Sequence, residues 1–413
     1  MNSTGTHLSG VWAKVTDLQI ERGLGCRVFD TNGRDYLDFT AGIGAASTGH
    51  AHPKVAQAIA DQASRIVHAQ INVYRHDLLE PLASKLAELT PEGIDTFFFD
   101  SSSDAVIEAA VKLAKHATGR RNIVVFDGAF HGRTHYTMAM STSRSIDREG
   151  YGPLPAGVLV APFPDPHASD QEAEVSRALK ALDRIFTTQV PTNEVAAIVI
   201  EPVIGERGYI PTPKAFIAGL AERCAAHGML FVADETQSGF GRTGKMFAME
   251  ALDVVPDIIC MAKGVASGFP FAALGTRREL DDRWRTGSHS GSSNGNPLGC
   301  AAALATIAVL TEPGFLDNVK ARGDQLIDAL RDLQQLDQAL LHVRGRGLMV
   351  ATEFDTSERA QAIVDHCLTE SNVILMTAGT RRRTIRWMPP LIVTSEEINE
   401  AVTAFSSAIR ATG

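Results

Sequence analysis

Two apolar runs, each ending in an ionisable side chain, constrain the fold of this chain more than any other feature. The first run is Phe231–Asp234 (FVAD), which is followed by a glycine-rich loop reaching Gly244. The second run is Ile258–Lys263 (IICMAK). In an open α/β sheet, ligands lie beyond the carboxyl ends of the strands, so we expect Asp234 and Lys263 to face one crevice from neighbouring strands.

An amine and a carboxylate across one crevice suit pyridoxal phosphate. Its aldehyde needs an amine, which Lys263 could supply, and its ring nitrogen needs a carboxylate to stay protonated, which Asp234 could supply. Each residue alone has a plainer interpretation, because an Asp that ends a strand is often a turn residue and a single Lys is usually a solvated charge. The flanking sequence decides between these interpretations.

The flanking sequence resembles the class III aminotransferases over nearly the full length of the chain, most closely enzymes like 4-aminobutyrate aminotransferase. The motifs that carry the resemblance are residues 233–250 (ADETQSGFGRTGKMFAME), 255–263 (VPDIICMAK), 128–134 (GAFHGRT), 200–206 (IEPVIGE) and 295–300 (GNPLGC). Several motifs in the family's order are far more specific than any one of them. The resemblance implies pyridoxal-phosphate-dependent transfer of an amino group, by a ping-pong mechanism, from a primary amine or ω-amino acid to a 2-oxo acid such as 2-oxoglutarate or pyruvate.

Other functions stay open at this point. The same fold type supports aminomutases, racemases and decarboxylases. A nicotinamide oxidoreductase would share the open sheet, but a G-x-G-x-x-G turn after the first strand is missing. A binding protein without catalytic activity is a further alternative.

The length of 413 residues is too great for one compact core and indicates two domains. Alternating strand and helix patterns, such as the β-branched strand Val195–Ile200 followed by a helix from Pro213 to Gly228, favour an α/β fold with a mostly parallel sheet. The resemblance implies fold type I of the pyridoxal phosphate enzymes, with a large domain of mostly parallel sheet flanked by helices and a smaller α+β domain. We expect residues 1–50 to form an N-terminal arm that contributes to the small domain, residues 51–297 the large cofactor-binding domain and residues 298–413 the small domain.

Composition limits which macromolecular partners and which cellular compartment we expect for this protein. A net charge of −9 argues against a nucleic-acid or anionic-membrane partner. The five cysteines show no paired spacing typical of metal ligands, so we expect no metal and a reduced cytoplasmic setting. The first ten residues lack a charged head followed by an apolar segment, and the apolar run from Leu298 to Leu310 is too short for a bilayer span.

The cofactor contacts are assigned partly from local patterns and partly from the resemblance. Residues 104–117 predict an amphipathic helix ended by Gly119, with Ser101 and Asp104 forming a capping-box-like start. The start of a helix attracts phosphate, which nominates Ser102 and Ser103. The family usually has glycine where this chain has Ser102, so Ser102 would be strained if that place needs a positive φ. The resemblance implies the remaining contacts: Phe130 stacked on the ring, His131 beside it, Gln237, and Ser292 reaching the phosphate of the neighbouring subunit in a homodimer.

Substrate contacts follow from the resemblance as well. It implies that Ile43, in a glycine-rich segment at the entrance, touches substrate and that Arg133 helps to hold a distal carboxylate. It also implies that Glu206 pairs with Arg386 when the donor is bound and releases it for the α-carboxylate of the acceptor. An arginine fork suits a planar carboxylate, although a purely structural Glu206–Arg386 ion pair stays an alternative. The family tends to have glycine where this chain has Arg207.

Overall fold

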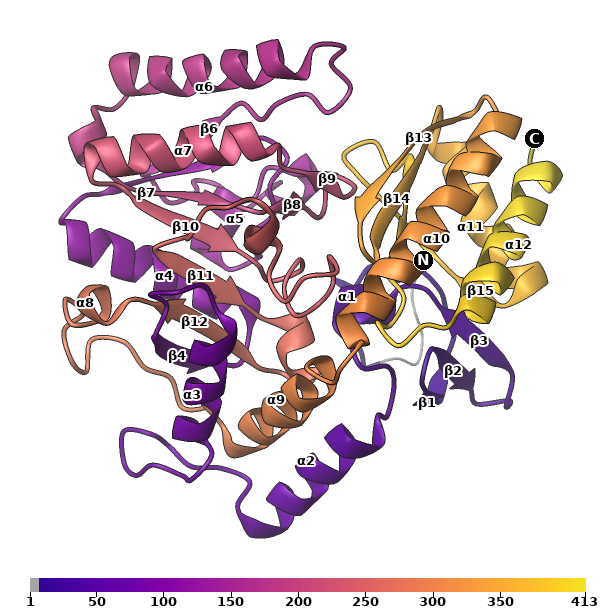
Figure 1. Ribbon diagram of the computed structural model, residues 1–413, viewed down its shortest axis with the longest axis horizontal. Helices are drawn as coiled ribbons and strands as arrows, with labels where there is room; N and C mark the ends of the chain where they lie inside the picture. Colours follow the sequence, from indigo (N-terminus) through magenta and orange to yellow (C-terminus); the bar gives the residue numbers. More distant parts are fainter. Residues whose placement is uncertain (1–6) are drawn as a thin grey trace.

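A seven-stranded sheet forms the centre of the larger part of the protein (Figure 1). The computed structural model describes residues 7–413. The strands lie in the order β4 (Thr96–Asp100), β12 (Ala272–Thr276), β11 (Ile258–Met261), β10 (Leu230–Asp234), β7 (Val195–Ile200), β5 (Asn122–Phe126) and β6 (Val158–Ala161). Strand β12 runs in the direction opposite to that of the other strands in this sheet. The prediction of an α/β fold with a mostly parallel sheet is therefore confirmed.

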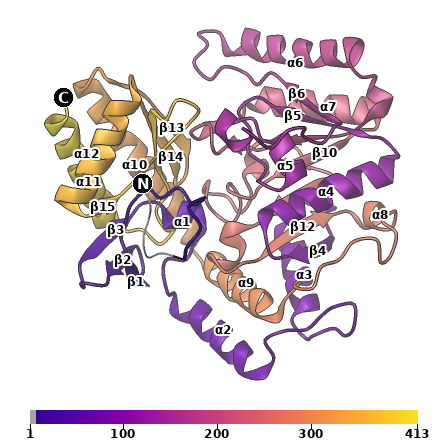
Figure 2. The same cartoon turned by 180° about the vertical axis from the view of Figure 1, so that it is seen from behind.

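Helices cover both faces of this sheet, which is why its strands are apolar without alternation. All six residues of β7 are buried. On one face Val124 and Ile198 pack with α7 (Lys214–His227) and α6 (Gln171–Thr188), and on the other face residues such as Ile123 pack with α4 (Ser103–Thr118). Figures 1 and 2 show α6 and α7 stacked together on one side of the sheet.

The start of α4 differs from the prediction by one residue. Ser102, rather than Ser101, is the N-cap, because its hydroxyl accepts a hydrogen bond from the amide of Ala105 at 3.3 Å. The hydroxyl of Ser101 instead donates to the carbonyl of Ser293. Ser102 has a φ of −143°, an extended conformation that any residue adopts, so the absence of glycine there causes no backbone strain. Gly119 ends the helix with a φ of 69°, as expected.

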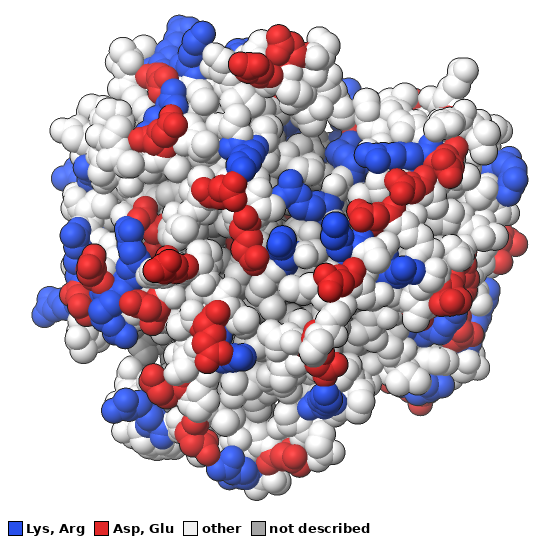
Figure 3. Space-filling view, in the orientation of Figure 1, with Lys and Arg blue, Asp and Glu red and all other residues white. Residues whose placement is uncertain are grey.

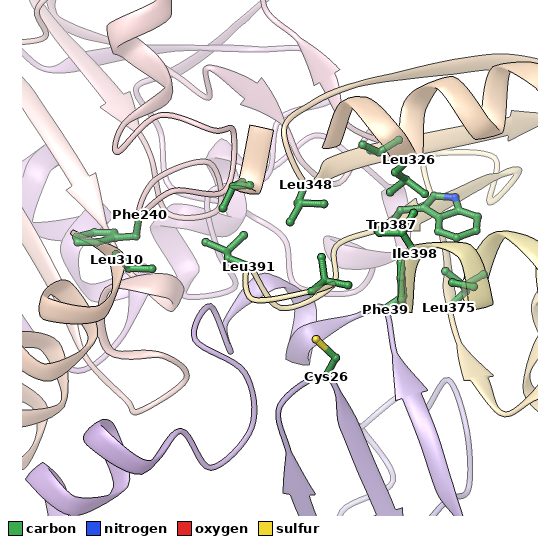
Figure 4. Packing of buried hydrophobic residues seen from close by; sticks show 14 of the residues in the cluster. Cys26, Phe39, Phe240, Leu310, Leu326, Leu348, Leu375, Trp387, Leu391 and Ile398 are labelled. Atoms are coloured by element: carbon green, nitrogen blue, oxygen red, sulfur yellow. The ribbon is translucent and has the colours of Figure 1, made fainter. Parts of the chain in front are cut away.

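The C-terminal part folds around a second, antiparallel sheet. Its strands are β13 (Leu340–Arg346), β14 (Met349–Phe354), β17 (Thr384–Trp387) and β16 (Met376–Ala378), and its helices are α10 (Phe315–Leu336), α11 (Ser357–Ser371) and α12 (Ser395–Ala411). The N-terminal hairpin joins this part: β1 (Ile20–Leu24), β2 (Arg27–Asp30) and β3 (Asp35–Asp38) form a sheet with β15 (Val373–Ile374), which runs parallel to β3. Aliphatic and aromatic side chains, among them Phe39, Trp387 and Ile398, fill the space between these elements (Figure 4).

The predicted domain boundaries stay predictions. The helix that begins at the proposed boundary, α9 (Pro297–Leu310), packs against α2 (Pro53–Arg65) and α3 (Leu79–Leu89) (Figure 1). This packing favours a C-terminal unit that starts after α9 rather than at residue 298. The short helices are α1 (Ala41–Gly44), α5 (His135–Met140) and α8 (Arg278–Asp281), and the two-stranded hairpin is β8 (Val203–Ile204) with β9 (Ile210–Pro211).

Two further features concern cysteine and membrane spans. All five cysteines are free and buried, and burial raises the pKa of the Cys300 and Cys367 thiols to about 12. Within residues 7–413, no single helix combines the length and apolar character that a membrane span requires. By those two criteria α9 and α10 pass only when taken together, and they are bent by 72°.

Candidate active site

A cavity of about 60 Å³ opens at the carboxyl edge of the parallel strands. Its lining comes from residues at or shortly after the carboxyl ends of five strands: β4, β5, β7, β10 and β11. The lining residues are Ser103, Phe130, His131, Gly132, Glu201, Gly205, Glu206, Asp234, Thr236, Gln237 and Lys263. We call this space the central cavity. Its position is the one that ligands take in open α/β sheets, and it brings Asp234 and Lys263 together as expected.

A buried histidine and aspartate form the floor of the central cavity. His131 Nδ1 lies 2.8 Å from Asp234 Oδ2, and the amide of Thr236 donates to Asp234 Oδ1 at 3.1 Å. Burial opposes ionisation of Asp234, but the hydrogen bond and charge of His131 outweigh it and lower the pKa of Asp234. Burial likewise opposes the charged form of His131, but Asp234 raises the pKa of His131. Asp234 therefore stays a carboxylate, which is the form that can hold a protonated ring nitrogen.

Lys263 lies at the first position of a 3₁₀ turn, Lys263–Ala266, directly after β11. Its φ of 49° is in the left-handed region, which is uncommon for a residue other than glycine. Two residues of the N-terminal segment hold this turn: Ser47 Oγ donates to the carbonyl of Gly264 at 2.9 Å, and the amide of Thr48 donates to Ser267 Oγ at 3.1 Å.

The electrostatic surroundings favour an uncharged amine on Lys263. Desolvation in the central cavity lowers the pKa of Lys263, although the charge of Glu206 acts in the opposite direction. The charge of Arg386 lowers this pKa further. A lowered pKa increases the fraction of neutral amine, which is the nucleophilic and proton-accepting form.

Glu201 is a lining residue that the sequence prediction did not assign, although it belongs to the 200–206 motif. Its Oε1 accepts from the amide of Phe130 and its Oε2 from the amide of Gly205, both at 2.9 Å. Glu201 thereby joins the loop after β5 to the turn after β7 and holds the backbone of Phe130. Burial raises the pKa of Glu201 to about 7, and the nearby charge of Asp234 adds to the effect.

Glu206 and Arg386 form an ion pair at one end of the central cavity. The guanidinium of Arg386 donates to Glu206 Oε1 at 2.6 Å, and the Arg386 side chain is only 2% exposed. Burial opposes ionisation of Glu206, but the charge of Arg386 outweighs it and lowers the pKa of Glu206. Lys263 and Arg144 lower this pKa as well. The Nε of Arg386 has no partner among the described residues.

Besides Arg386, which pairs with the lining residue Glu206, four residues nominated from the sequence do not line the central cavity. Arg133 turns outward: its side chain is 58% exposed, and its guanidinium donates to Asp147 Oδ1 at 3.0 Å. Ile43 lies on α1, is 41% exposed and has a φ of 63°. Ser102 and Ser292 are exposed. The roles given to these four residues stay predictions.

The lining of the central cavity has hydrogen-bonding groups that the protein leaves without partners. His131 Nε2 and Gln237 Oε1 are buried and make no hydrogen bond within residues 7–413. Buried polar atoms nearly always have a partner, so a bound molecule with polar groups would satisfy them. Ser103 adds the start of a 16-residue helix, which suits a phosphate. Pyridoxal phosphate fits this set of groups: the ionised Asp234, Lys263 with its lowered pKa, and the start of the helix.

Comparison with known proteins identifies the family. The family model described as aminotransferase class-III matches residues 9–409. The chain belongs to the class III aminotransferases. Members of this family use pyridoxal phosphate, and this aminotransferase therefore has the cofactor that the cavity fits. The alternative functions within the same fold type are not favoured.

Relatives and solved structures of class III aminotransferases cover nearly the whole chain. A probable 4-aminobutyrate aminotransferase of Bacillus subtilis is 35% identical over 94% of this chain and 92% of its own length. The 5-aminovalerate aminotransferase of Pseudomonas putida is 37% identical over 88% of this chain and 87% of its own length. An amine transaminase from an uncultivated Pseudomonas species, solved with pyridoxal phosphate bound, has a TM-score of 0.90 at 26% identity and covers 100% of this chain and 98% of its own.

Proposed function

We propose that this class III aminotransferase takes the amino group from an ω-amino acid of the 4-aminobutyrate type and passes it to a 2-oxo acid, 2-oxoglutarate or pyruvate, by a ping-pong mechanism. The observation that carries the proposal is the Glu206–Arg386 ion pair, whose carboxylate lines the central cavity together with Lys263. A donor whose amine lies far from its carboxylate leaves no carboxylate next to the reacting carbon, whereas a 2-oxo acid has one there. Arg386 can bind that carboxylate if Glu206 releases it.

The residues of the central cavity have distinct roles in the proposed reaction. When bound, pyridoxal phosphate supplies an electron sink that stabilises negative charge on the reacting carbon. Lys263 Nζ, whose pKa is lowered by desolvation, accepts the proton from the carbon that bears the donor's amino group. Asp234 holds a proton on the ring nitrogen, and His131 keeps Asp234 oriented. Phe130 buries one face of the ring, its backbone fixed by Glu201.

The enzyme is proposed to be a cytoplasmic homodimer in which Ser292 contacts the phosphate held by the other subunit. Val67, Val73 and Tyr74 are exposed by more than half, and such a group of apolar side chains indicates an interface. Asn72, in the same segment, donates to Ser290 Oγ at 2.7 Å and so lies beside the loop that carries Ser292. Light scattering should give twice the chain mass. Ser292→Ala should weaken cofactor binding about tenfold, as the loss of one hydrogen bond to a charged group does, while Ser290→Ala should not.

Half-reaction spectroscopy tests the substrate assignment. The holoenzyme is mixed with 4-aminobutyrate, 5-aminovalerate, an ornithine derivative or a simple alkylamine, and the loss of the visible band of the lysine-bound cofactor is followed. The aminated enzyme is then mixed with 2-oxoglutarate or pyruvate, and recovery of the band is measured. We expect ω-amino acids to bleach the band at least tenfold faster than alkylamines of equal length. Equal rates would contradict the role of a donor carboxylate, and no bleaching by any amine would contradict aminotransfer itself.

A further inference from the structure

A second hollow lies at the junction of the two parts of the protein, separate from the central cavity. Its volume is about 310 Å³. One wall comes from the segment after β6 and from Arg207, and the other comes from β13, β14 and residues 379–384. Its charged lining residues are Asp165, Arg207, Arg344, Glu353, Arg381 and Arg383. We call this space the arginine hollow.

The arginine hollow is basic although the protein is acidic. Four arginines and two carboxylates line it, which leaves a formal charge of +2, whereas the whole chain carries −9. Figure 3 shows Lys and Arg side chains gathered in the groove between the two parts on this face, while the two signs of charge are intermixed over much of the remaining surface. A recess lined by one sign of charge concentrates small ions of the other sign.

Glu353 fixes two of the four arginines. Its side chain is only 7% exposed, its Oε1 lies 2.7 Å from Arg383, and its Oε2 accepts from Arg344. Arg344 also donates through Nε to the carbonyl of Gly208 at 2.9 Å. Both oxygens of Glu353 are therefore occupied, and the guanidinium groups are held in place before any ligand arrives. Such preorganisation lowers the entropy cost of binding.

The other two arginines keep donors available. Arg207 donates one hydrogen bond, to the carbonyl of Asp127 at 3.2 Å, and its guanidinium lies 3.8 Å from the carboxylate of the same residue. Arg381 is exposed and makes no hydrogen bond or ion pair within residues 7–413. Arg207 occupies a place where the family tends to have glycine, and Arg381 lies in a run of three arginines at 381–383. The catalytic reaction proposed above uses neither residue.

We propose that the arginine hollow binds a small, multiply charged anion, a polycarboxylate or phosphate compound. Guanidinium groups match the planar, multidentate oxygens of both. The walls of the hollow adjoin segments of the central site, because the amide of Gly379 donates to the carbonyl of Glu206 at 3.0 Å and Thr384 lies on the same strand as Arg386. An anion in the hollow would contact the segments that carry both partners of the Glu206–Arg386 pair. It can be the distal end of a long substrate or a separate effector.

Calorimetric titration of the holoenzyme with inorganic pyrophosphate and with citrate tests the site. The cofactor already fills the phosphate position of the central cavity in this form. We expect saturable binding that Arg381→Gln weakens about tenfold, a typical cost for one charge-assisted contact, and that the double variant Arg207→Gln, Arg381→Gln abolishes. Arg382→Gln is the matched control, because Arg382 is also exposed, adjoins Arg381 and bonds Thr377 Oγ1 instead of lining the hollow.

The outcomes separate clearly. No saturable binding of either probe, or equal weakening by Arg381→Gln and Arg382→Gln, would overturn the proposal. If bound citrate raises the KM of the amine donor without changing kcat, the hollow holds the distal end of a substrate; if it changes kcat, the hollow holds an effector. The titration needs no turnover, so a failure of the proposed substrate assignment would leave its result unchanged.

Discussion

Two carboxylate–arginine pairs near the central cavity have opposite burial. In the inner pair the arginine is enclosed: the Arg386 side chain is 2% exposed and that of Glu206 is 23% exposed. In the outer pair the carboxylate is enclosed: the Asp147 side chain is 6% exposed and that of Arg133 is 58% exposed. An enclosed cation that loses its partner must find another anion, whereas an exposed one is solvated by water. The inner pair is therefore suited to exchange its carboxylate for that of a substrate, and the outer pair is not.

The comparison predicts that effects on activity decrease from the buried floor of the cavity to its exposed rim. Lys263→Ala should have the largest effect, because it removes both the nucleophile and the proton acceptor. We expect kcat/KM to fall by about 10³-fold or more, with loss of the visible band in the spectrum of the reconstituted protein. An unchanged thermal unfolding curve would show that the fold survives. Activity retained by this variant would rule out Lys263 as the base.

Asp234→Asn should have the next largest effect. The uncharged amide of asparagine stabilises a protonated ring nitrogen less than a carboxylate does. We therefore expect kcat to fall by about 10²–10³-fold, as for the loss of one preorganised electrostatic contact. Pre-steady-state mixing with the amine donor measures the step directly. Asp253→Asn is the matched control, since that side chain is 70% exposed and, among residues 7–413, pairs only with Lys214. Equal rates for the two variants would show that Asp234 has no particular role in this step, which would contradict the comparison.

Lysine substitutions test the two arginine pairs against each other. Arg386→Lys should raise the KM of the 2-oxo acid by about 10–100-fold, because it removes a buried charge-assisted fork. Arg133→Lys should change any kinetic constant by less than about fivefold, the range of an exposed ion pair. Steady-state kinetics with both substrates varied gives these numbers. If Arg133→Lys has the larger effect, Arg133 contacts substrate and the comparison between the two pairs is wrong.

The pH dependence of stability tests the raised pKa of Glu201. A carboxyl with a folded pKa of about 7 binds a proton more tightly in the folded state than in the unfolded state. Its contribution to stability is complete below about pH 4.5 and is lost as the pH rises to 7, by about 1.4 kcal/mol for each pKa unit. In chemical denaturation, the free energy of unfolding of Glu201→Gln should therefore decline less than that of the parent between pH 5 and 7. Parallel curves would mean that Glu201 has an ordinary pKa in the fold.

The smallest effect is expected at Ile43 on the rim. A β-branched residue with a φ of 63° is strained, and asparagine tolerates this conformation better. Ile43→Asn should raise the free energy of unfolding by up to about 1 kcal/mol while raising the KM of the donor severalfold through the lost apolar contact. Val255→Asn, at an exposed position without a positive φ, should bring no gain in stability. A destabilised Ile43→Asn would show that packing at the rim outweighs the strain.

The sequence predicts the parts of the site that depend on chain order. Asp234, Lys263, Phe130 and His131 each follow an apolar strand, and parallel strands bring such positions to one edge of a sheet. The helix over residues 104–117 and the strand at 195–200 were predictable because their patterns are long or strongly apolar. The family motifs then specified which of these side chains would share a cavity.

What the sequence could not predict depends on burial and on partners distant in the chain. Arg133 pairs with Asp147, 14 positions further along in an irregular segment without a periodic pattern. The raised pKa of Glu201 arises because the surrounding chain excludes water, which no local pattern records. Only the backbone shows that Ser102 needs no positive φ. The packing of α9 against α2 likewise joins segments more than 200 residues apart.

The five buried thiols can report where the native enzyme opens locally, because a thiol reacts only when the structure around it opens. Cys260 lies on a central strand, Cys224 on a covering helix and Cys367 in the C-terminal unit, so each reports on a different layer. Alkylation followed by peptide mass mapping would rank the order in which these layers loosen. Conversely, a single cysteine introduced on the surface would be the only site that a maleimide dye modifies in the folded protein.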